Sequence, residues 1–278
     1  MPGARRTAVS YTVGFGLSIR RSCRLVGMCR ATYAYRLRDK GDGLLRVRLR
    51  ELAEQRRRFG CPRLHVMLKR ENLVINHKRT ERIYREEELS LRLKKRRKKA
   101  AVLRVMLSQA EHADQRWSMD FVCDSTSTGR RFRALAVVDD YSRECPALEV
   151  DSSIPGARVV DVLDRLAEMR GLPEVITMDN GPEFASRTLD EWAYRRGVKL
   201  NFIRPGKPVE NAYAESFIGR LRDECLNENW FSSVREARDI IETWRRDYNE
   251  VRPHSSLDNL SPMEFMETRE KTLIDSGL

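Results

Sequence analysis

The charge of this chain is divided so unevenly along the sequence that it limits the fold before any element is assigned. Residues 1–100 hold 29 lysines and arginines against 9 acidic residues, a net charge of +20, whereas residues 101–278 have a net charge of −8. A region this basic needs a polyanionic partner or a fully solvated surface. The alternative, that the charge serves only solubility, does not explain why it is confined to one part of the chain. We therefore predict a basic region over 1–100 and a separate acidic domain after it.

Composition excludes several classes of protein. Hydrophobic residues make up 41% of the chain, which is enough for a sizeable core, and no run approaches the roughly 18 apolar residues of a membrane helix. None of the six cysteines forms a CxxC pair, so we expect reduced thiols and small, buried side chains for all six. The four histidines show no zinc-ligand spacing with them.

Two segments of the basic region have the pattern of helix-turn-helix units, at about 18–35 and 62–88. In the first, apolar positions recur on either side of a turn at Gly27. In the second, Asn76 is placed to cap a helix that begins at residue 77. The start of such a helix suits contacts to phosphates or base edges. The residues there are His77, Lys78, Arg79 and Arg82.

A run of six cations, KKRRKK, ends the basic region at residues 94–99. Blocks of like charge are usually unfolded and often contact nucleic acid. We predict such contacts for Lys94, Lys95, Arg96 and Arg97. The run marks a domain boundary, followed by a linker over residues 101–115 and a second domain over 116–278.

The second domain alternates between strand and helix patterns. Strands are expected at 117–123, 132–138, 146–150, 174–178 and 199–203, and helices at 157–170, 186–196, 209–226 and 233–249. This order predicts an α/β domain, a mixed five-stranded sheet with helices packed on it.

Three acidic residues of this domain stand where an ionised carboxylate is costly unless it is paired or binds a metal. Asp120 lies inside an apolar strand, Asp179 closes another, and Glu215 lies at the edge of the buried stripe of a helix, on the same edge as Arg222. Each also has a structural alternative: a strand-edge charge, a turn residue before Asn-Gly, and a surface ion pair with Arg222, respectively. Taken together, they form a set of hard oxygen ligands suited to Mg²⁺ or Mn²⁺.

The surrounding strings resemble a known family, the OrfB-type transposases of two-frame bacterial insertion sequences, which have a retroviral-integrase-like catalytic core. Asp179 and Glu215 are separated by 35 residues, as in the D, D-35-E pattern of that core. The resemblance spans nearly the whole chain. It is carried by MDNGPEF, PGKPVENAYAESFIGRLRDECLN and YNEVRPHSSL in the acidic domain, and by RRFGCPRLHVMLKRE and NHKRTERIYREE in the basic region. Cys61 departs from the family, in which an aromatic residue is common there.

The resemblance implies a ribonuclease H-like fold and Mg²⁺-dependent (or Mn²⁺-dependent) DNA strand cleavage and strand transfer, with two ions per site. Asp120, Asp179 and Glu215 match the catalytic, metal-binding DDE triad. Arg222 matches a basic residue two turns after the glutamate, and with Lys207 it would grip phosphates near the scissile bond. Two other readings stay open: a catalytically silent DNA-binding relic or regulator, and a ribonuclease H-like nuclease that cuts without strand transfer.

The resemblance also implies partners and a location. We expect the chain to act on double-stranded DNA, both the terminal repeats of an insertion sequence and the target, as a homo-oligomer. The first-frame product of such an element, or a fusion with it, is a further expected partner. The expected location is the bacterial cytoplasm, in association with the nucleoid.

Overall fold

The computed structural model describes residues 2–35, 41–91, 109–204 and 208–276 of the 278-residue chain. Two compact units divide the chain, Met1–Val47 and Arg48–Leu278. The boundary expected at residue 100 falls outside the described ranges, so the domain limits remain a prediction.

None of the helices in the described ranges has the length and apolar character needed to cross a membrane.

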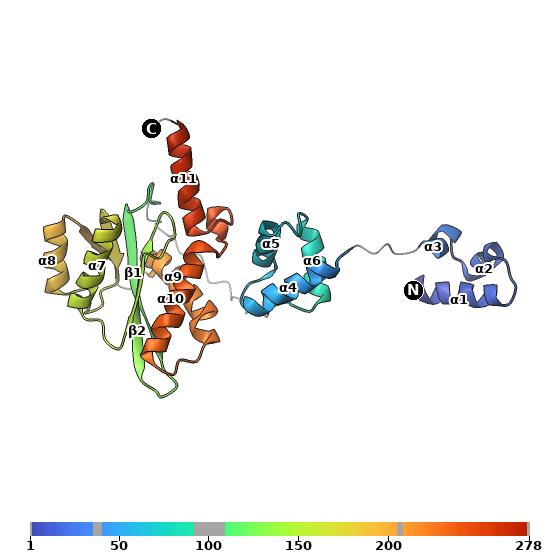
Figure 1. The fold of residues 1–278 in the computed structure, drawn as a ribbon, viewed down its shortest axis with the longest axis horizontal. Helices are drawn as coiled ribbons and strands as arrows, with labels where there is room; N and C mark the ends of the chain where they lie inside the picture. Colours follow the sequence, from blue (N-terminus) through green and yellow to red (C-terminus); the bar gives the residue numbers. More distant parts are fainter. Residues whose placement is uncertain (1, 36–40, 92–108, 205–207, 277–278) are drawn as a thin grey trace. The chain divides into compact units, whose positions relative to one another are not determined.

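The first unit contains two short helices about a tight turn, as predicted for residues 18–35. Its elements are α1 (Pro2–Gly14), α2 (Ile19–Val26) and α3 (Arg30–Ala34) (Figure 1). The Ser18 hydroxyl caps α2 by accepting a hydrogen bond from the Arg21 N–H, and Gly27 ends it at a left-handed φ of 67°. Val9 of α1 and Cys23 of α2 are buried together. Helix α1 was not predicted, because serine, threonine and glycine interrupt its apolar positions.

The second unit opens with a three-helix segment whose last two helices match the unit predicted at 62–88. The helices are α4 (Gly43–Gln55, which crosses the boundary between the units), α5 (Cys61–Arg70) and α6 (His77–Glu86). Leu52 of α4, Leu64 of α5 and Ile83 of α6 are almost wholly buried. Asn76 caps α6 as expected, since its Oδ1 accepts a hydrogen bond of 3.0 Å from the Lys78 N–H.

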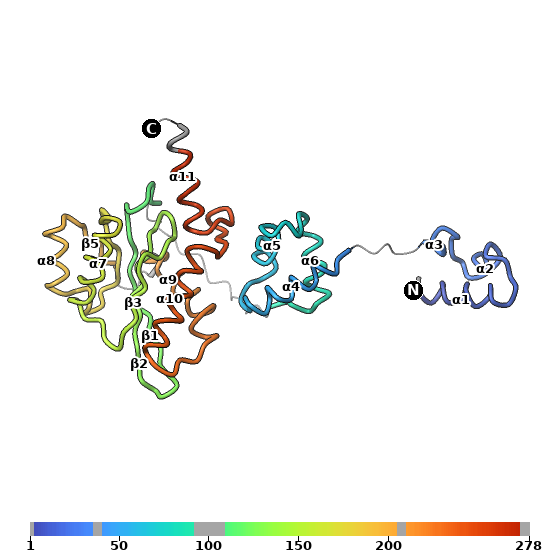
Figure 2. The backbone as a smooth tube through the Cα atoms, in the orientation of Figure 1, coloured from blue at the N-terminus to red at the C-terminus, as the bar shows by residue number. Residues whose placement is uncertain are grey.

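The predicted mixed five-stranded sheet is confirmed. Its strands are β1 (Arg116–Ser125), β2 (Arg131–Asp139), β3 (Ala147–Asp151), β4 (Val175–Met178) and β5 (Lys199–Phe202). They lie in the order β3-β2-β1-β4-β5, and the chain can be followed through them in Figure 2. The first three strands form an antiparallel meander, whereas β4 and β5 run parallel to β1. The central strand β1 thus joins the antiparallel and parallel halves.

Helices cover both faces of this sheet (Figure 1). They are α7 (Gly156–Arg170), α8 (Arg187–Arg196), α9 (Ala212–Glu224), α10 (Val234–Glu250) and α11 (Pro262–Ser276), with 3₁₀ turns at Pro208–Asn211, Leu226–Glu228 and Ser255–Leu257. Trp117 and Met119 of β1 join the core shared with α7 and α8, whereas Val122 joins the core shared with α9 and α10. Because side chains alternate along a strand, Asp120 lies on the Val122 face, the face that α9 covers.

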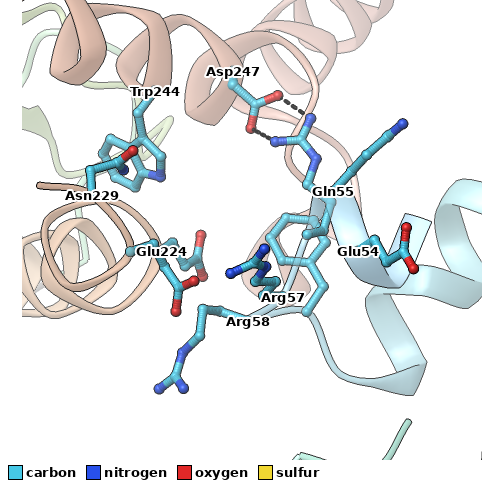
Figure 3. Close-up of a pocket in the computed structure, with 11 residues that line it drawn as sticks. Glu54, Gln55, Arg57, Arg58, Glu224, Asn229, Trp244 and Asp247 are labelled. Atoms are coloured by element: carbon cyan, nitrogen blue, oxygen red, sulfur yellow. Dashed lines mark hydrogen bonds and ion pairs between the residues drawn. The ribbon is translucent and has the colours of Figure 1, made fainter. Parts of the chain in front are cut away.

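Ion pairs connect the α4–α5 segment to the two helices on that face. Arg56 donates two hydrogen bonds of 2.5 and 2.6 Å to the Asp247 carboxylate of α10 (Figure 3). Arg63 donates to Glu224 at the end of α9, and Arg252 donates to the same carboxylate through two bonds of 2.7 Å. An acid in the last turn of a helix opposes the helix dipole. These arginines therefore offset an otherwise unfavourable charge.

Phe59, which lies between α4 and α5, is enclosed by the same arginines. Its side chain is buried, and the guanidinium carbons of Arg56, Arg63 and Arg252 lie 5.2–5.9 Å from its ring centroid. Cations held over an aromatic face gain electrostatic attraction, more so when they are desolvated. The contact between the helical segment and the core thus combines charge pairs with one buried aromatic ring.

Candidate active site

The register of the parallel strands β1 and β4 places two of the predicted acids side by side. Ser118 of β1 pairs with Thr177 of β4, and continuing this register by two residues sets Asp179 beside Asp120. Neighbouring strands in a sheet are about 4.8 Å apart. Two residues separated by 58 others in the sequence therefore lie side by side, Asp120 within β1 and Asp179 directly after the end of β4.

The third acid is held near this point by a contact that the sequence reasoning missed. Asn211, just before α9, is buried and donates a hydrogen bond of 2.9 Å to the Met119 carbonyl of β1, the residue before Asp120. Glu215 follows one helical turn later and is exposed. The predicted buried stripe of α9 is confirmed, and it places Glu215 on the rim of the helix: the stripe comprises Ala214, Phe217, Ile218, Leu221 and Cys225. A polar residue at the start of a helix could have signalled such an anchor.

The electrostatics of Asp120 connect all four predicted residues. Burial raises its pKa to about 6, a hydrogen bond from the Phe121 N–H opposes the rise, the charges of Asp179 and Glu215 add to it, and Arg222 lowers it. Charges shift a neighbouring pKa most strongly at short range and in a poorly hydrated place. The fold therefore brings the three acids and Arg222 into one electrostatic neighbourhood.

Glu215 has a perturbed carboxyl as well. Although the residue as a whole is exposed, partial desolvation raises the pKa of its carboxyl. Among the described residues, no ion pair joins Glu215 to Arg222, so the alternative of a surface pair between them is not seen. An acid without a cationic partner beside two further acids is disposed to attract a cation.

Asp179 also stabilises the turn that follows β4, which is the structural role that the sequence left open for it. Its Oδ1 accepts a hydrogen bond of 3.0 Å from the Gly181 N–H. A Cβ at Gly181 would lie 3.0 Å from the same oxygen, closer than ordinary van der Waals contact. Glycine thus lets the backbone approach the carboxylate and fix its direction. The two roles are compatible, because a carboxylate has more than one lone pair to offer.

The donor chemistry of this neighbourhood fits a divalent cation of the Mg²⁺ class. Three carboxylates supply hard oxygen ligands, and burial, together with the charges of Asp179 and Glu215, raises the pKa of Asp120, so a bound cation would stabilise its ionised form. The Asn211 Oδ1 is buried and has no hydrogen-bond partner. As the side chains lie, however, no three histidine, cysteine or acidic residues within the described ranges converge closely enough to hold an ion.

The two aspartates that end β2 are structural, as predicted from their sequence position. Asp140 is buried and accepts hydrogen bonds from Arg116 and from the Ser118 hydroxyl. Asp139, also buried, accepts from the Tyr141 N–H. Burial raises the pKa of both carboxyls, but these partners satisfy them and leave no role for a cation.

The predicted DNA-contact residues divide into described and undescribed sets. Lys207 and the cations Lys94, Lys95, Arg96 and Arg97 lie outside the described residues. The remaining four, His77, Lys78, Arg79 and Arg82, lie in the first turns of α6. His77 and Lys78 are exposed, whereas Arg79 and Arg82 are half-buried, and Arg82 pairs with Glu86. The first two side chains therefore lie on the surface, and contact of these four residues with DNA stays a prediction.

Comparison with known proteins identifies both parts of the chain. Family models described as an integrase core domain match residues 110–208 and 196–262, and one described as an HTH-like domain matches residues 40–99. The cryo-EM structure of the simian T-cell lymphotropic virus intasome in complex with PP2A regulatory subunit B56 gamma is similar in fold, with a TM-score of 0.52 and 13% identity over 78% of this chain and 73% of that one. The sheet and its helices are thus those of a ribonuclease H-like integrase core.

Relatives extend the match along the chain. It is 48% identical over 250 residues to the insertion element IS407 uncharacterized 31.7 kDa protein of Burkholderia multivorans, which covers 90% of each chain. It is 45% identical over 250 residues to the insertion element IS476 uncharacterized 39.2 kDa protein of Xanthomonas euvesicatoria, covering 90% of this chain and 72% of that one. The putative transposase InsK for insertion sequence element IS150 of Escherichia coli K12 is 26% identical over 85% of this chain and 89% of its own. The chain belongs to the family of insertion-element proteins that carry an integrase core behind an HTH-like domain.

Proposed function

We propose that this chain is the transposase of an insertion sequence, a DDE enzyme that cleaves the ends of its element and joins them to target DNA. The observation that supports the proposal most is the strand register that sets Asp179 beside Asp120, with the start of α9 and Glu215 held next to them by the Asn211 hydrogen bond to β1. Perturbed acids that share one place mark functional sites more often than chance allows. Family membership gives the reaction class, and this cluster supplies residues able to perform it.

Each residue has a distinct task in the proposed reaction. Asp120, Asp179 and Glu215 would hold two divalent cations, which when bound supply a more acidic water or 3′-hydroxyl and a stabilised leaving oxygen. Two hydrogen bonds would position these carboxylates. The Gly181 N–H orients Asp179, and the Asn211 amide holds the start of α9 on β1. Arg222 attracts the scissile phosphate and offsets its charge.

DNA recognition falls to the basic helices. The first turns of α6 present His77 and Lys78 to solvent, and such positions suit contacts to backbone phosphates or groove edges. Lys207 and residues 94–97 would add phosphate contacts. We propose double-stranded DNA as the partner, with the chain assembled as a homo-oligomer on element ends and, where the element has a first frame, with that product.

Strand joining with Mg²⁺ on DNA that carries the ends of the parent element tests the proposal. Asp179→Asn and Glu215→Gln should each abolish cleavage and joining while leaving the fold intact. Asp124→Asn is the matched control, because Asp124 also lies on β1. Like Asp120, it accepts a hydrogen bond from the N–H of the next residue, here Ser125. Full activity of Asp179→Asn or Glu215→Gln would show that the assignment is wrong.

The same assay separates the alternatives. A silent DNA-binding relic would bind element ends without cutting them. A nuclease of this fold would cut but form no joined product. Arg222→Ala should weaken DNA engagement more than metal binding, and lost metal binding with unchanged DNA affinity would contradict the role given to Arg222.

A further inference from the structure

Two adjoining cavities lie beside α9, on the face next to Glu215. Their volumes are about 350 and 450 Å³, and they adjoin, because both are lined by Arg63, Arg220 and Ser255. Their walls come from α5, from α9 and from the turn at residues 255–259. Ser216 and Arg220, four residues apart, face the first cavity from α9, and Ser216 directly follows the proposed catalytic Glu215. We call this cavity pair the arginine groove.

The charge of the arginine groove is strongly one-sided. Among the described residues, the first cavity is lined by four arginines and no acidic residue, and the second by a single acid, Asp223, which pairs with Arg58. Arg63 and Arg252 share the single carboxylate of Glu224. Within the described ranges, Arg143 and Arg220 have no ion-pair partner. Burial and the nearby Arg252 and Arg220 lower the pKa of Arg63, as crowding of like charges requires.

Arg143 is held in place at a conformational cost. Its φ is 64°, in the left-handed region that a long side chain seldom adopts. Its guanidinium carbon lies 3.9 Å from the Tyr213 ring centroid, and its NH1 donates to the Asp140 carbonyl. Strained residues persist where their surroundings hold them, and they concentrate at binding sites. The charge of Arg143 is therefore positioned before any ligand arrives.

The groove also contains hydrogen-bond donors without partners. Within the part of the chain that the structure describes, the hydroxyls of Ser216, Ser255 and Ser256 make no hydrogen bond. The buried His254 lies among them, and burial together with Arg252 and the other nearby arginines lowers its pKa to about 3, so it stays neutral. Guanidinium groups combined with free hydroxyls suit the oxygens of a phosphate.

We infer that the arginine groove binds backbone phosphates of the DNA strand that runs to the catalytic carboxylates, with Arg143 and Arg220 as the principal contacts. This inference rests on the proposed function and deepens it. A DNA strand is favoured over a free phosphate ion because the groove extends through two cavities and has walls from both the HTH-like part and the integrase core. Ser216, which lines the first cavity, directly follows Glu215 in the sequence, so a strand bound in the groove would pass close to the start of α9.

The test is the salt dependence of DNA binding by the full chain, measured in EDTA by fluorescence anisotropy of a short duplex of arbitrary sequence. Each lost phosphate contact lowers the slope of log affinity against log salt by about 0.9. We expect that decrease for Arg220→Gln, and a further decrease when Arg143→Gln is added. Ser256→Asp, at an exposed position, should weaken binding by adding a negative charge that repels the phosphates. Arg195→Gln, on the exposed side of α8, is the control and should keep the wild-type slope.

The outcomes distinguish the groove from the catalytic proposal. An unchanged slope in Arg220→Gln and in Ser256→Asp, with the fold intact, would overturn the groove assignment. So would variants that lose affinity for inorganic pyrophosphate yet keep the DNA slope, since the site would then take small anions only. Asp179→Asn should bind DNA with the wild-type slope in EDTA, so its behaviour in strand joining decides the catalytic proposal independently.

Discussion

Replacing Asp120 by asparagine should make the metal-free protein more stable at neutral pH, although the same change should abolish catalysis. Asparagine has nearly the same shape, and its side-chain oxygen can still accept the hydrogen bond of 2.7 Å from the Phe121 N–H. What the substitution removes is an ionised carboxylate in a poorly hydrated place beside two others. Sites built for function commonly carry such a cost in stability.

The size and pH range of the effect follow from the pKa of Asp120. A rise from 3.8 to about 6 corresponds to about 3 kcal/mol, at about 1.4 kcal/mol per unit. Because the carboxyl keeps some contact with solvent, we expect a gain of about 1–3 kcal/mol. Below about pH 4 the carboxyl is protonated in both folded and unfolded chains and carries no penalty. The penalty grows between about pH 4 and 6 and is complete above that.

Urea unfolding followed by tryptophan fluorescence can measure this. All four tryptophans, at positions 117, 192, 230 and 244, lie in the integrase core, so the signal reports on that part of the chain. In EDTA, Asp120→Asn should raise the free energy of unfolding at pH 7.5 and not at pH 4. Asp124→Asn should change it little at either pH. A destabilised Asp120→Asn, or a gain that does not depend on pH, would refute the reasoning.

Three further substitutions test other parts of the structure. Glu224→Gln should lower the free energy of unfolding by about 3–5 kcal/mol, because it leaves Arg252, only 3% exposed, without its carboxylate; a loss under about 1 kcal/mol in urea would contradict this. Gly181→Ala should reduce strand joining with an unchanged urea midpoint, because the new Cβ would press on Asp179; wild-type rates would argue against a fixed carboxylate direction. Gly219→Ala, with open space at its Cβ in the middle of α9, should stabilise the core by about 0.5–1 kcal/mol in the same melts.

The pattern of apolar residues was sufficient to predict the core. The strands were predicted to within one or two residues, because strands covered on both faces read as short, nearly continuous apolar runs bounded by turn residues. The α9 helix was predicted from residue 209 but begins at Ala212, since a 3₁₀ turn, which ends at Asn211, precedes it. Helix α11 was not predicted.

The candidate site was predictable in its residue types and not in its contacts. Asp120 and Asp179 stood out because charge is unusual inside or directly after an apolar strand. Asn211 did not, because its role depends on reaching the Met119 carbonyl, a partner 92 positions away. Arg143 and Arg220 were missed for a similar reason. Single arginines in an arginine-rich sequence carry no signal until the fold places them around one cavity.

The α9 helix has Glu215 in its first turn and Glu224 at its last residue, about 14 Å apart at 1.5 Å per residue. The first acid belongs to the proposed catalytic set, and the second accepts a hydrogen bond from Arg63 of the segment that matches the HTH-like model. A helix this short is stiff, so a displacement of its C-terminal end also moves its N-terminal end. Under the proposed function, α9 would therefore couple movement of the segment expected to contact DNA to the position of Glu215.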